Sequence, residues 1–336
     1  MVRVAVVGYG YWGPNLVRNF FETPGATLAA VCEANADRLA LVSKRFPGVS
    51  TITQYEEVLA DKEIDAVVIA TPVSTHHAMA KAALNAGKHV LVEKPLTGNV
   101  PDAEDLVAVA AARKLTLMVD HIFVYSPAVR LMKEVVDSGQ LGNLLFVDSV
   151  RVNLGLFQKD VNVVWDLAPH DLSIIDYVVG RMPRSVATFG AAHADEKIED
   201  VAYLNLDFGD KLIANFHVNW LSPVKIRYTI LGGSKKSLVY NDLDPIEKVK
   251  IYDSGITVNT DDLEGRRNLM ISYRTGDVWC PRIATTEPLR NMAGHFVECI
   301  EKGTTPITDG QAGLRLVRIL DAAQRSIKAQ GGRITL

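Results

Sequence analysis

The chain of 336 residues has little of what a metal site, a membrane span or a nucleic-acid interface requires. Its three cysteines, Cys32, Cys280 and Cys299, show neither metal-ligand spacing nor a disulfide framework. No apolar run approaches the ~20 residues that a membrane-spanning helix needs. The formal net charge is −3, which is unlike the basic balance of a protein that binds nucleic acid. We therefore expect no metal, no membrane and no nucleic-acid partner.

The amino terminus leaves no space for a targeting segment. Met1 leads directly into the apolar run 2–7, so we expect no signal peptide and a reducing, cytoplasmic location. Hydrophobic residues make up 48% of the chain and charged residues 22%, which is typical of a soluble globular protein. Because 336 residues exceed what one hydrophobic core usually holds, the length predicts two domains.

Residues 1–122 alternate short apolar runs with helical patterns. The runs are 2–7, 26–32, 66–70, 89–92 and 115–119, and helical spacing covers 14–22, 36–46, 74–86 and 102–113. This alternation predicts a doubly wound parallel sheet of the Rossmann type. The runs are apolar throughout, as expected for strands that are covered on both faces.

The sequence pattern of residues 123–336 differs from that of residues 1–122 and predicts an α+β domain. Helices are expected at 127–138, 166–179, 288–301 and 309–329, and strands at 186–189, 201–208, 211–218, 225–231 and 237–240. Gly209-Asp210 joins two of these strands and indicates a hairpin. We expect an open, largely antiparallel sheet whose uncovered face is a candidate interface for a homo-dimer or homo-tetramer. Residues 253–287 are polar and loop-like.

The pattern Gly8-x-Gly10-x-x-Gly13 lies between the first strand and the first helix. Gly8 permits a tight turn, Gly10 lets the backbone approach a pyrophosphate, and Gly13 allows the helix to pack closely on the strand. Tyr11 and Trp12 belong to the same turn. Phosphates would lie at the helix N-terminus, where free N–H groups favour negative charge. The arrangement predicts a dinucleotide site, although a tight turn in an empty sheet would have the same pattern.

Glu33 follows the second strand, 20 residues after Gly13. A carboxylate there accepts hydrogen bonds from ribose hydroxyls and repels a 2′-phosphate, which favours NAD over NADP. Arg38 lies nearby and could partly offset this repulsion.

Glu93-Lys94-Pro95 ends another apolar strand and predicts a reactive position. Lys94 would lie beside the nicotinamide at the carboxyl end of a parallel strand, where it can hydrogen-bond a reacting oxygen. Thr71-Pro72 ends the preceding strand near the expected path of the cofactor. His76 could contact the cofactor too, but an ordinary helix start also explains it.

Asp166 and His170 are four residues apart on a predicted helix and therefore share a face. The imidazole can accept a proton near neutral pH, and the carboxylate can orient it. Alone, such a pair is more often structural; it is a catalytic candidate because Lys94 needs a proton acceptor opposite it. Pro169 suggests that the helix begins near that residue.

Four further residues are candidates for contact with the substrate or the nicotinamide. His121 and Tyr125 follow the last predicted strand of the first domain and should face the cleft. Gln158 and Trp165 are candidate pocket walls, with core packing as the alternative for Trp165.

Two groups of basic residues are less specific. The first group could meet a diphosphate or a carboxylate and comprises Arg266, Arg267, Arg274 and Arg282. The second group follows a solvated helix face and comprises Arg315, Arg318, Arg325 and Lys328.

Taken together, these motifs resemble the glucose–fructose oxidoreductase / inositol dehydrogenase / MocA (Gfo/Idh/MocA) family. The resemblance spans the chain and rests on the glycine turn, Ala70-Thr71-Pro72, Glu93-Lys94-Pro95, Asp166 with His170, and Gly294–Glu298 with Asp309-Gly310. It implies a NAD-binding Rossmann domain over residues 1–122 and a domain over 123–336 that binds substrate and forms oligomers. It also implies that Glu93 contacts the nicotinamide ribose and that Lys94-Pro95 is often a cis peptide.

The resemblance further implies oxidation or reduction of a secondary alcohol of a sugar, cyclitol or nucleotide sugar, with Lys94, Asp166 and His170 as catalytic residues. The stretches 10–16 and 165–171 are similar to members that act at C3 of UDP-N-acetylglucosamine or its uronic acid. Relatives often carry a glycine between the catalytic aspartate and histidine. In this chain the three residues between Asp166 and His170 are Leu167, Ala168 and Pro169, without a glycine. Two alternatives stay open: an NAD-dependent glycoside hydrolase that oxidises its substrate transiently, and a non-catalytic NAD-binding regulator.

Overall fold

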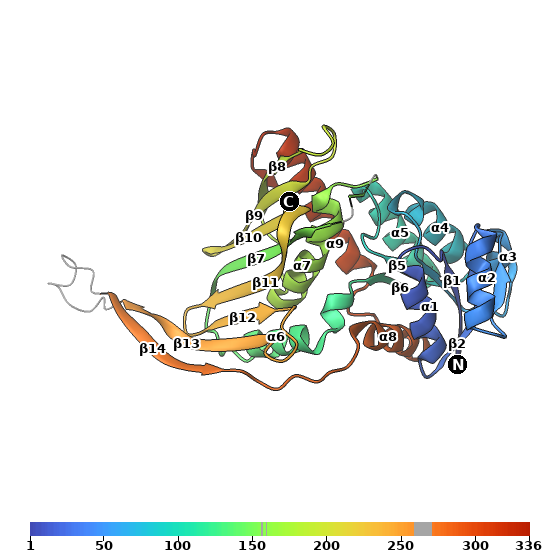
Figure 1. Cartoon of the computed structure of the whole chain (residues 1–336), viewed down its shortest axis with the longest axis horizontal. Coiled ribbons are helices and arrows are strands. Elements are labelled where there is room, and N and C mark those ends of the chain that lie inside the picture. The colour runs from blue at the N-terminus through green and yellow to red at the C-terminus, as the bar shows by residue number, and fades with distance from the viewer. Residues whose placement is uncertain (156, 159, 259–270) are drawn as a thin grey trace. The chain divides into compact units, whose positions relative to one another are not determined.

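The chain folds into two compact units (Figure 1). The first unit comprises Met1–Ser126 and Thr286–Asp321, and the second comprises Pro127–Thr285 and Ala322–Leu336. The computed structural model describes residues 1–155, 157–158, 160–258 and 271–336. The assignment of the cofactor to residues 1–122 and of the substrate to residues 123–336 stays a prediction.

A six-stranded parallel sheet forms the centre of the first unit. Its strands are β1 (Val2–Val7), β2 (Ala26–Cys32), β3 (Ser50–Ile52), β4 (Ala66–Ile69), β5 (His89–Glu93) and β6 (Leu117–Asp120). They lie in the order β3-β2-β1-β4-β5-β6, so the chain reverses direction across the sheet after β3. This arrangement confirms the predicted doubly wound sheet. The short strand β3 was not predicted, because its three residues carry no buried apolar run.

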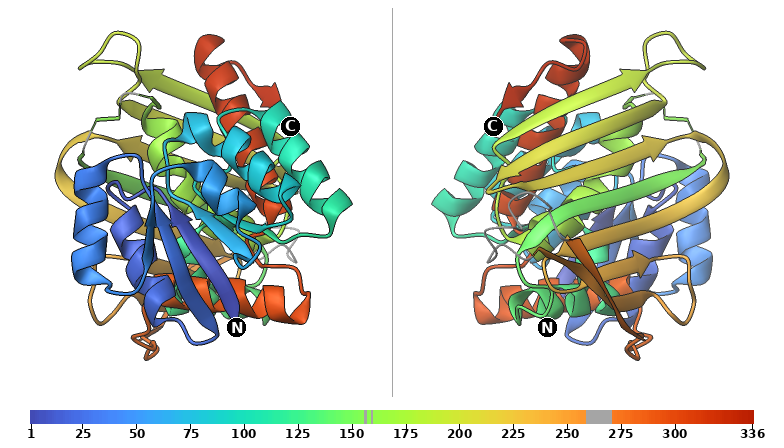
Figure 2. Two further views of the ribbon diagram at one scale, coloured as in Figure 1. Left: turned by 90° about the vertical axis from the view of Figure 1, so that its right-hand side faces the viewer. Right: turned by 90° about the vertical axis from the view of Figure 1, so that its left-hand side faces the viewer.

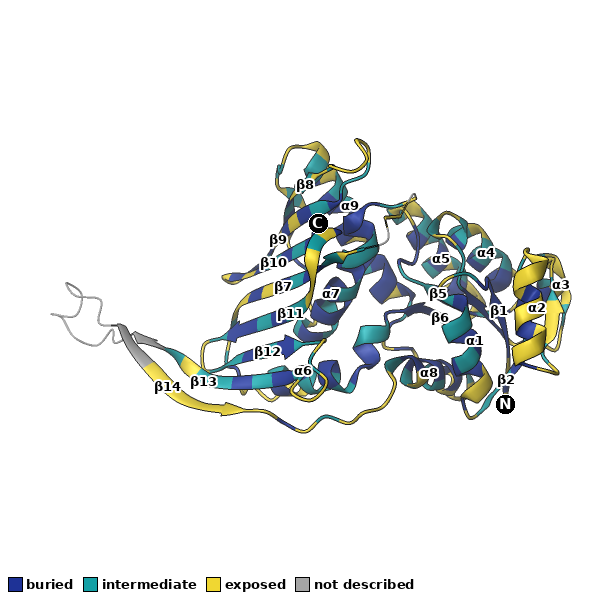
Figure 3. Ribbon diagram, in the orientation of Figure 1, coloured by how far each residue is buried: buried dark blue, intermediate teal, exposed yellow. Residues whose placement is uncertain are grey.

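Helices connect these strands and cover the sheet. They are α1 (Gly13–Glu22), α2 (Ala36–Arg45), α3 (Tyr55–Ala60), α4 (Val73–Asn85), α5 (Val100–Arg113), the 3₁₀ helix η1 (Ile122–Tyr125), α8 (Pro288–Lys302) and α9 (Gly310–Lys328), of which the residues up to Asp321 belong to this unit. Strands β1, β4, β5 and β6 are buried along most of their length (Figure 3), which explains their continuous apolar runs.

A nine-stranded mixed sheet forms the second unit. Its strands are β7 (Leu144–Leu154), β8 (Ser185–Ala191), β9 (Val201–Gly209), β10 (Leu212–Asn219), β11 (Leu221–Gly233), β12 (Ser237–Asn241), β13 (Val249–Val258), β14 (Ile271–Trp279) and β15 (Ile334–Thr335). The order is β14-β13-β12-β11-β7-β10-β9-β8-β15, and β10 pairs with β7 in parallel while the other pairs are antiparallel. The hairpin around Gly209-Asp210 is confirmed.

This sheet is covered on one face. In β10, Leu212, Ala214, Phe216 and Val218 are buried, whereas Ile213 is 61% exposed. The buried face packs against helix α7 (Val163–Val179), which also contacts α6 (Pro127–Asp137). The right-hand view of Figure 2 faces the other side, and among the described residues no helix crosses in front of β8–β11 there. The prediction of an open sheet is therefore confirmed.

Two sequence-based expectations for the second unit are wrong. Helix α7 begins at Val163, because the Asn162 side chain accepts a hydrogen bond from the Trp165 backbone N–H and caps the helix. Pro169 lies inside α7. Residues 253–287 include the end of β13 and all of β14, which pair in an antiparallel ladder. Their polar sequence is explained by exposure, since the side chains described in β14 are exposed.

Within the described part of the chain, none of the helices combines the length and the apolar character that a membrane crossing requires.

Candidate active site

The glycine turn between β1 and α1 forms a cradle that only glycine fits at two positions. Gly8 has φ +96°, and a Cβ there would lie 2.5 Å from the carbonyl oxygen of Ala70. A Cβ on Gly13 would lie 2.2 Å from the carbonyl oxygen of Gly8. The N-cap residue of α1, Trp12, makes no side-chain capping hydrogen bond, and Tyr11 is 85% exposed. A close backbone approach and an uncapped helix N-terminus suit the pyrophosphate of a dinucleotide.

Glu33 is held at the carboxyl end of β2 by the same turn. Its Oε2 accepts from the Tyr9 backbone N–H at 2.7 Å, and its Oε1 accepts from the Asn35 backbone N–H at 2.9 Å. Burial alone would raise the pKa of this carboxyl, but these two hydrogen bonds and the charge of Arg38 together lower it. Arg38 Nη1 lies 3.6 Å from Glu33 Oε2. Glu33 is therefore ionised and oriented at neutral pH.

His76 joins the ends of two strands. Its ring nitrogens lie 2.9 Å from the carbonyl oxygens of Thr71 and Pro95, which follow β4 and β5. Thr71 also shares a hydrogen bond with Thr75 at 2.7 Å, and Pro72 is the exposed N-cap residue of α4. The imidazole thus ties the loop that begins α4 to the loop that carries Lys94. Direct contact of Thr71, Pro72 and His76 with a cofactor stays a prediction.

Two acidic residues lie side by side at the carboxyl ends of β5 and β6. Glu93 and Asp120 are register partners on these parallel strands, and Asp120 Oδ2 accepts from Trp12 Nε1 at 3.2 Å. Burial and then the charge of Asp120 raise the pKa of Glu93 well above its usual range. Burial also raises the pKa of Asp120. Because two carboxylates offer only acceptors, a proton on Glu93 supplies the donor that the pair lacks.

His121 follows Asp120 and is 2% exposed. Within the described chain, neither ring nitrogen of His121 makes a hydrogen bond. Burial, followed by the charges of Lys94 and Arg315, lowers the pKa of His121 to about 3, so the ring is neutral. Arg315 on α9 is half-buried, and its charge acts on His121. A buried neutral imidazole with no partner costs about 1–3 kcal/mol, and a ligand would remove this cost.

Lys94 directly follows β5, between the carboxyl pair and Pro95. The peptide bond between Lys94 and Pro95 is cis, as the family resemblance implied. The Lys94 backbone N–H donates to Glu93 Oε2 at 3.2 Å, and its side chain is partly exposed. The carboxyl ends of parallel strands are where such folds bind ligands. The first unit therefore brings Lys94, Glu93 and His121 to the same edge as the glycine turn.

Asp166 and His170 lie one turn apart on α7 in the second unit, and both are partly exposed. Asp166 Oδ2 accepts from Trp220 Nε1 at 3.2 Å. Pro169 has no N–H to donate to the carbonyl of Trp165, so one helical hydrogen bond is missing beside this pair. Helical spacing places the carboxylate and the imidazole on one face. The approach of His170 to Lys94 would join the two units and stays a prediction.

The next residue, Asp171, anchors α7 on the sheet. Arg151 on β7 donates to it through Nε at 2.7 Å and through Nη2 at 2.9 Å. The two side chains are 2% and 6% exposed, so this bidentate pair is buried. The two parallel hydrogen bonds fix the orientation of these side chains relative to each other.

The other predicted contact residues occupy contrasting environments. Tyr125 is buried in the first unit, where its hydroxyl lies 3.1 Å from Thr308 Oγ1 and its ring packs near His295. Trp165 is 9% exposed on α7, and Gln158 is exposed in the segment between β7 and α7. Arg274 pairs with Asp253 on the neighbouring strand, whereas Arg266 and Arg267 lie outside the described residues.

Sequence reasoning missed Asp120, Arg151, Asp171 and Trp220. An acidic residue immediately after a buried strand, beside a second strand that also ends in an acid, could have indicated Asp120. Arg151 and Trp220 carry no comparable local signal, because their partners are 20 and 54 residues away in sequence.

Comparison with known proteins extends these observations. Residues 2–121 match the oxidoreductase family with an NAD-binding Rossmann fold, and residues 129–239 match the GFO/IDH/MocA C-terminal domain. The UDP-N-acetylglucosamine 3-dehydrogenase of Acidithiobacillus ferrooxidans is 31% identical over 62% of this chain and 64% of that protein. The NADP-dependent scyllo-inositol 2-dehydrogenase IolW of Bacillus subtilis is 24% identical over 97% of this chain and 94% of that protein. A Magnetospirillum magnetotacticum MS-1 structure described as an oxidoreductase has TM-score 0.81 at 30% identity, covering 96% of this chain and 99% of that one.

The fold, the glycine cradle and the strand-end lysine define an oxidoreductase with an NAD-binding Rossmann unit. The chain belongs to the GFO/IDH/MocA oxidoreductase family, whose members include sugar-alcohol and nucleotide-sugar dehydrogenases.

The glycine cradle predicts a position-specific effect on cofactor binding. Gly13→Ala should weaken NAD binding about tenfold or more, because its Cβ would push the Gly8 carbonyl out of the turn. Isothermal titration with NAD measures the change. Gly294→Ala is the matched control, since a Cβ there meets no atom within 4 Å and alanine favours the helix. Equal NAD affinity in the two variants would contradict the assignment of the cradle.

Proposed function

We propose that the enzyme transfers a hydride between a secondary alcohol of a sugar or nucleotide sugar and the nicotinamide of NAD. The observation that carries this proposal is Lys94 at the end of β5, at the same sheet edge as the glycine cradle. The proton acceptor is His170, which shares a face of α7 with Asp166. The resemblance to UDP-N-acetylglucosamine 3-dehydrogenase supports C3 of a UDP-N-acetylhexosamine, or of its uronate, as the reacting position.

In this mechanism the substrate hydroxyl is held by Lys94 and His170. Lys94 donates a hydrogen bond to the reacting oxygen, and His170 accepts the hydroxyl proton as the carbonyl forms. Asp166 orients the imidazole and stabilises its protonated form. NAD, when bound by the glycine cradle and Glu33, would supply the acceptor for the carbinol hydrogen, which leaves as hydride. In the reverse direction His170 returns the proton to the oxygen.

Two residues of the first unit, Glu93 and His121, have properties that suit a place beside the nicotinamide. Glu93 would contact the nicotinamide ribose, and its raised pKa lets it donate as well as accept. The neutral ring of His121 has a donor and an acceptor, neither of which has a partner in the described chain. We propose that His121 binds the nicotinamide amide or a substrate hydroxyl. Tyr125, Gln158 and Trp165 remain candidates for the substrate pocket.

The reaction is tested with NAD and a panel of UDP-sugars, free sugars and inositols, by the appearance of NADH. We expect turnover with a UDP-N-acetylhexosamine or its uronate. His170→Ala should lower kcat by ~10²–10⁴, the usual contribution of a general base, while NAD affinity stays unchanged. His77→Ala is the control, since this histidine pairs with Asp105 outside the proposed machinery.

The alternatives give different outcomes. Release of an aglycone without net NADH would favour a glycoside hydrolase that oxidises its substrate transiently. Tight NAD binding with no reaction across the panel would favour a non-catalytic regulator. Near-normal turnover of the His170→Ala variant would exclude His170 as the base.

We infer that NAD is preferred over NADP, with Glu33 as the determinant. Its carboxylate is ionised and fixed by two backbone N–H groups, so it would repel a 2′-phosphate. Glu33→Gln should raise the NADP/NAD ratio of kcat/KM about tenfold, because the charge is lost and Arg38 is released. The exposed neighbour Asp37→Asn is the control. An unchanged ratio in Glu33→Gln would show that the preference lies elsewhere.

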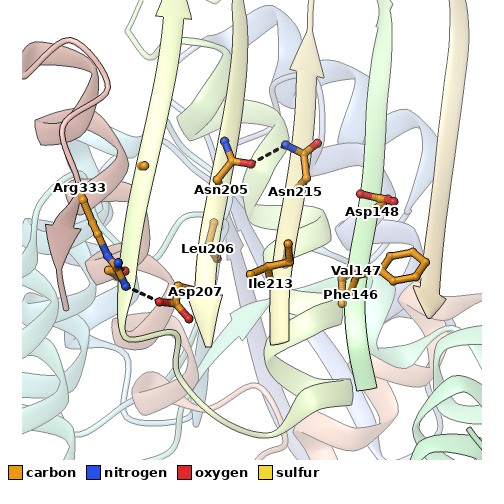
Figure 4. Close-up of a pocket in the computed structure, with 12 residues that line it drawn as sticks. Phe146, Val147, Asp148, Asn205, Leu206, Asp207, Ile213, Asn215 and Arg333 are labelled. Carbon is orange, nitrogen blue, oxygen red and sulfur yellow. Dashed lines mark hydrogen bonds and ion pairs between the residues drawn. The ribbon is translucent and has the colours of Figure 1, made fainter. Parts of the chain in front are cut away.

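We propose that the open face of the second unit's sheet joins copies of the chain into a dimer or tetramer. Two cross-strand pairs on this face are exposed, Phe189 with Tyr203 and Phe146 with Ile213. Figure 4 shows Phe146 and Ile213 among the residues that line a pocket, whose polar lining includes Asn205 and Asn215. Apolar side chains gathered in this way on an exposed face are typical of an interface.

Ile213→Glu should reduce the molar mass in solution to that of a smaller assembly, because a charge would be buried in the interface. Light scattering after size-exclusion chromatography measures this. Leu41→Glu on α2 is the matched control, since Leu41 is 60% and Ile213 61% exposed. The same molar mass for both variants and the unmodified chain would place the interface elsewhere or show that there is none.

A further inference from the structure

Trp220 connects the end of β10 to the proposed proton relay. The residue is 1% exposed and lies in the connection between β10 and β11. Its indole N–H donates to Asp166 Oδ2 at 3.2 Å. A buried indole N–H needs an acceptor, and here the acceptor is the carboxylate expected to orient His170.

The indole is held from several directions, so it has little freedom to follow a moving carboxylate. The Trp220 backbone N–H donates to the carbonyl of Asp200 at 2.9 Å, and its carbonyl accepts from Gly155 N at 3.1 Å. The ring packs against Phe157, with 5.3 Å between the ring centroids. Gly155 packs so close to the ring that a Cβ on this residue would lie 3.0 Å from the indole Cδ1. The position of the Asp166 carboxylate therefore follows that of the ring, which the other contacts hold in place.

The buried Arg151–Asp171 pair holds the same helix one residue beyond His170. Helix α7 is thus attached to the sheet at Asp171 and to the β10–β11 connection at Asp166. His170 lies between these two attachment points in sequence. With the helix fixed at Asp171, the orientation of the Asp166 carboxylate is left to its own hydrogen bonds.

We propose that Trp220 is a positioning residue for the Asp166–His170 pair, a role that rests on the proposed function. The indole N–H occupies one carboxylate oxygen and thereby limits rotation of the group. The other oxygen is then directed to the imidazole, which must be held in one orientation to accept the proton. Trp220 acts through Asp166 and does not touch the reacting atoms.

A double-mutant cycle on the full-length enzyme tests this role. Trp220→Phe keeps an aromatic ring and removes the donor, so kcat should fall about tenfold with NAD affinity and substrate KM unchanged. In an Asp166→Ala background the same change should lower kcat less than ~2-fold, because the carboxylate it positions is gone. The probe is NADH formation from NAD and the panel compound that reacts fastest.

Two further variants keep the test decisive. Tyr240→Phe is the control, because the buried Tyr240 hydroxyl also donates to a carboxylate in this unit, Asp242 Oδ1 at 2.9 Å. Loss of this hydroxyl should leave kcat unchanged. Gly155→Ala crowds the indole without removing it, and it replaces Trp220→Phe in the cycle if that variant does not fold. It should show the same dependence on Asp166.

The outcomes separate this proposal from the proposed function. Suppose that Asp166→Ala and His170→Ala lose activity. If Trp220→Phe then lowers kcat by the same factor in the unmodified enzyme and in the Asp166→Ala variant, or does not lower it at all, the role of Trp220 is wrong and the Asp166–His170 relay stands. If Asp166→Ala and His170→Ala keep normal turnover, or no compound reacts, the proposed function fails and the role of Trp220 fails with it.

Discussion

Parallel pairing in the first unit places the carboxyl ends of β1, β4, β5 and β6 at one edge of the sheet. In register, Val7 pairs with Ile69 and Glu93 with Asp120, so the residues that follow these strands are neighbours in space. Gly8, Thr71, Lys94 and His121 are all first or second residues after a strand. The pairing of strands therefore brings these residues to one edge of the sheet, and His76 ties the loops of Thr71 and Lys94 together there.

Burial at this edge changes the protonation of the groups gathered there. Glu93 and Asp120 are neighbouring acids with raised pKa values, and His121 is kept neutral by burial and by the cations Lys94 and Arg315. A carboxyl group with a raised pKa and a neutral imidazole can offer both hydrogen-bond donors and acceptors. Hydrogen-bonding groups of this kind recognise the amide and hydroxyl groups of a cofactor or a sugar well.

The second unit meets a different requirement, which is to hold one helix in a fixed position on an open sheet. Alternating burial in β9 and β10 covers the face that packs against α7 and exposes the other. Polar contacts then help to specify the position of the helix on this face, among them Arg151 with Asp171 and Trp220 with Asp166. Apolar packing alone would tolerate a small rotation of α7, whereas directional hydrogen bonds do not.

Features that depend on neighbours along the chain could be predicted from the amino-acid sequence. Strand–helix alternation predicted the Rossmann sheet, the glycine spacing predicted the cradle, and the four-residue interval placed Asp166 and His170 on one helix face. Folding in three dimensions decided the pairing of Glu93 with Asp120, the effect of the Arg315 charge on His121, and the contact of Trp220 with Asp166. It also decided that residues 253–258 continue β13 and that β14 is a strand, since an edge strand with exposed side chains lacks an apolar pattern. Local periodicity can be recognised from consecutive residues. These contacts instead depend on strand register and helix packing between segments that are far apart in the chain.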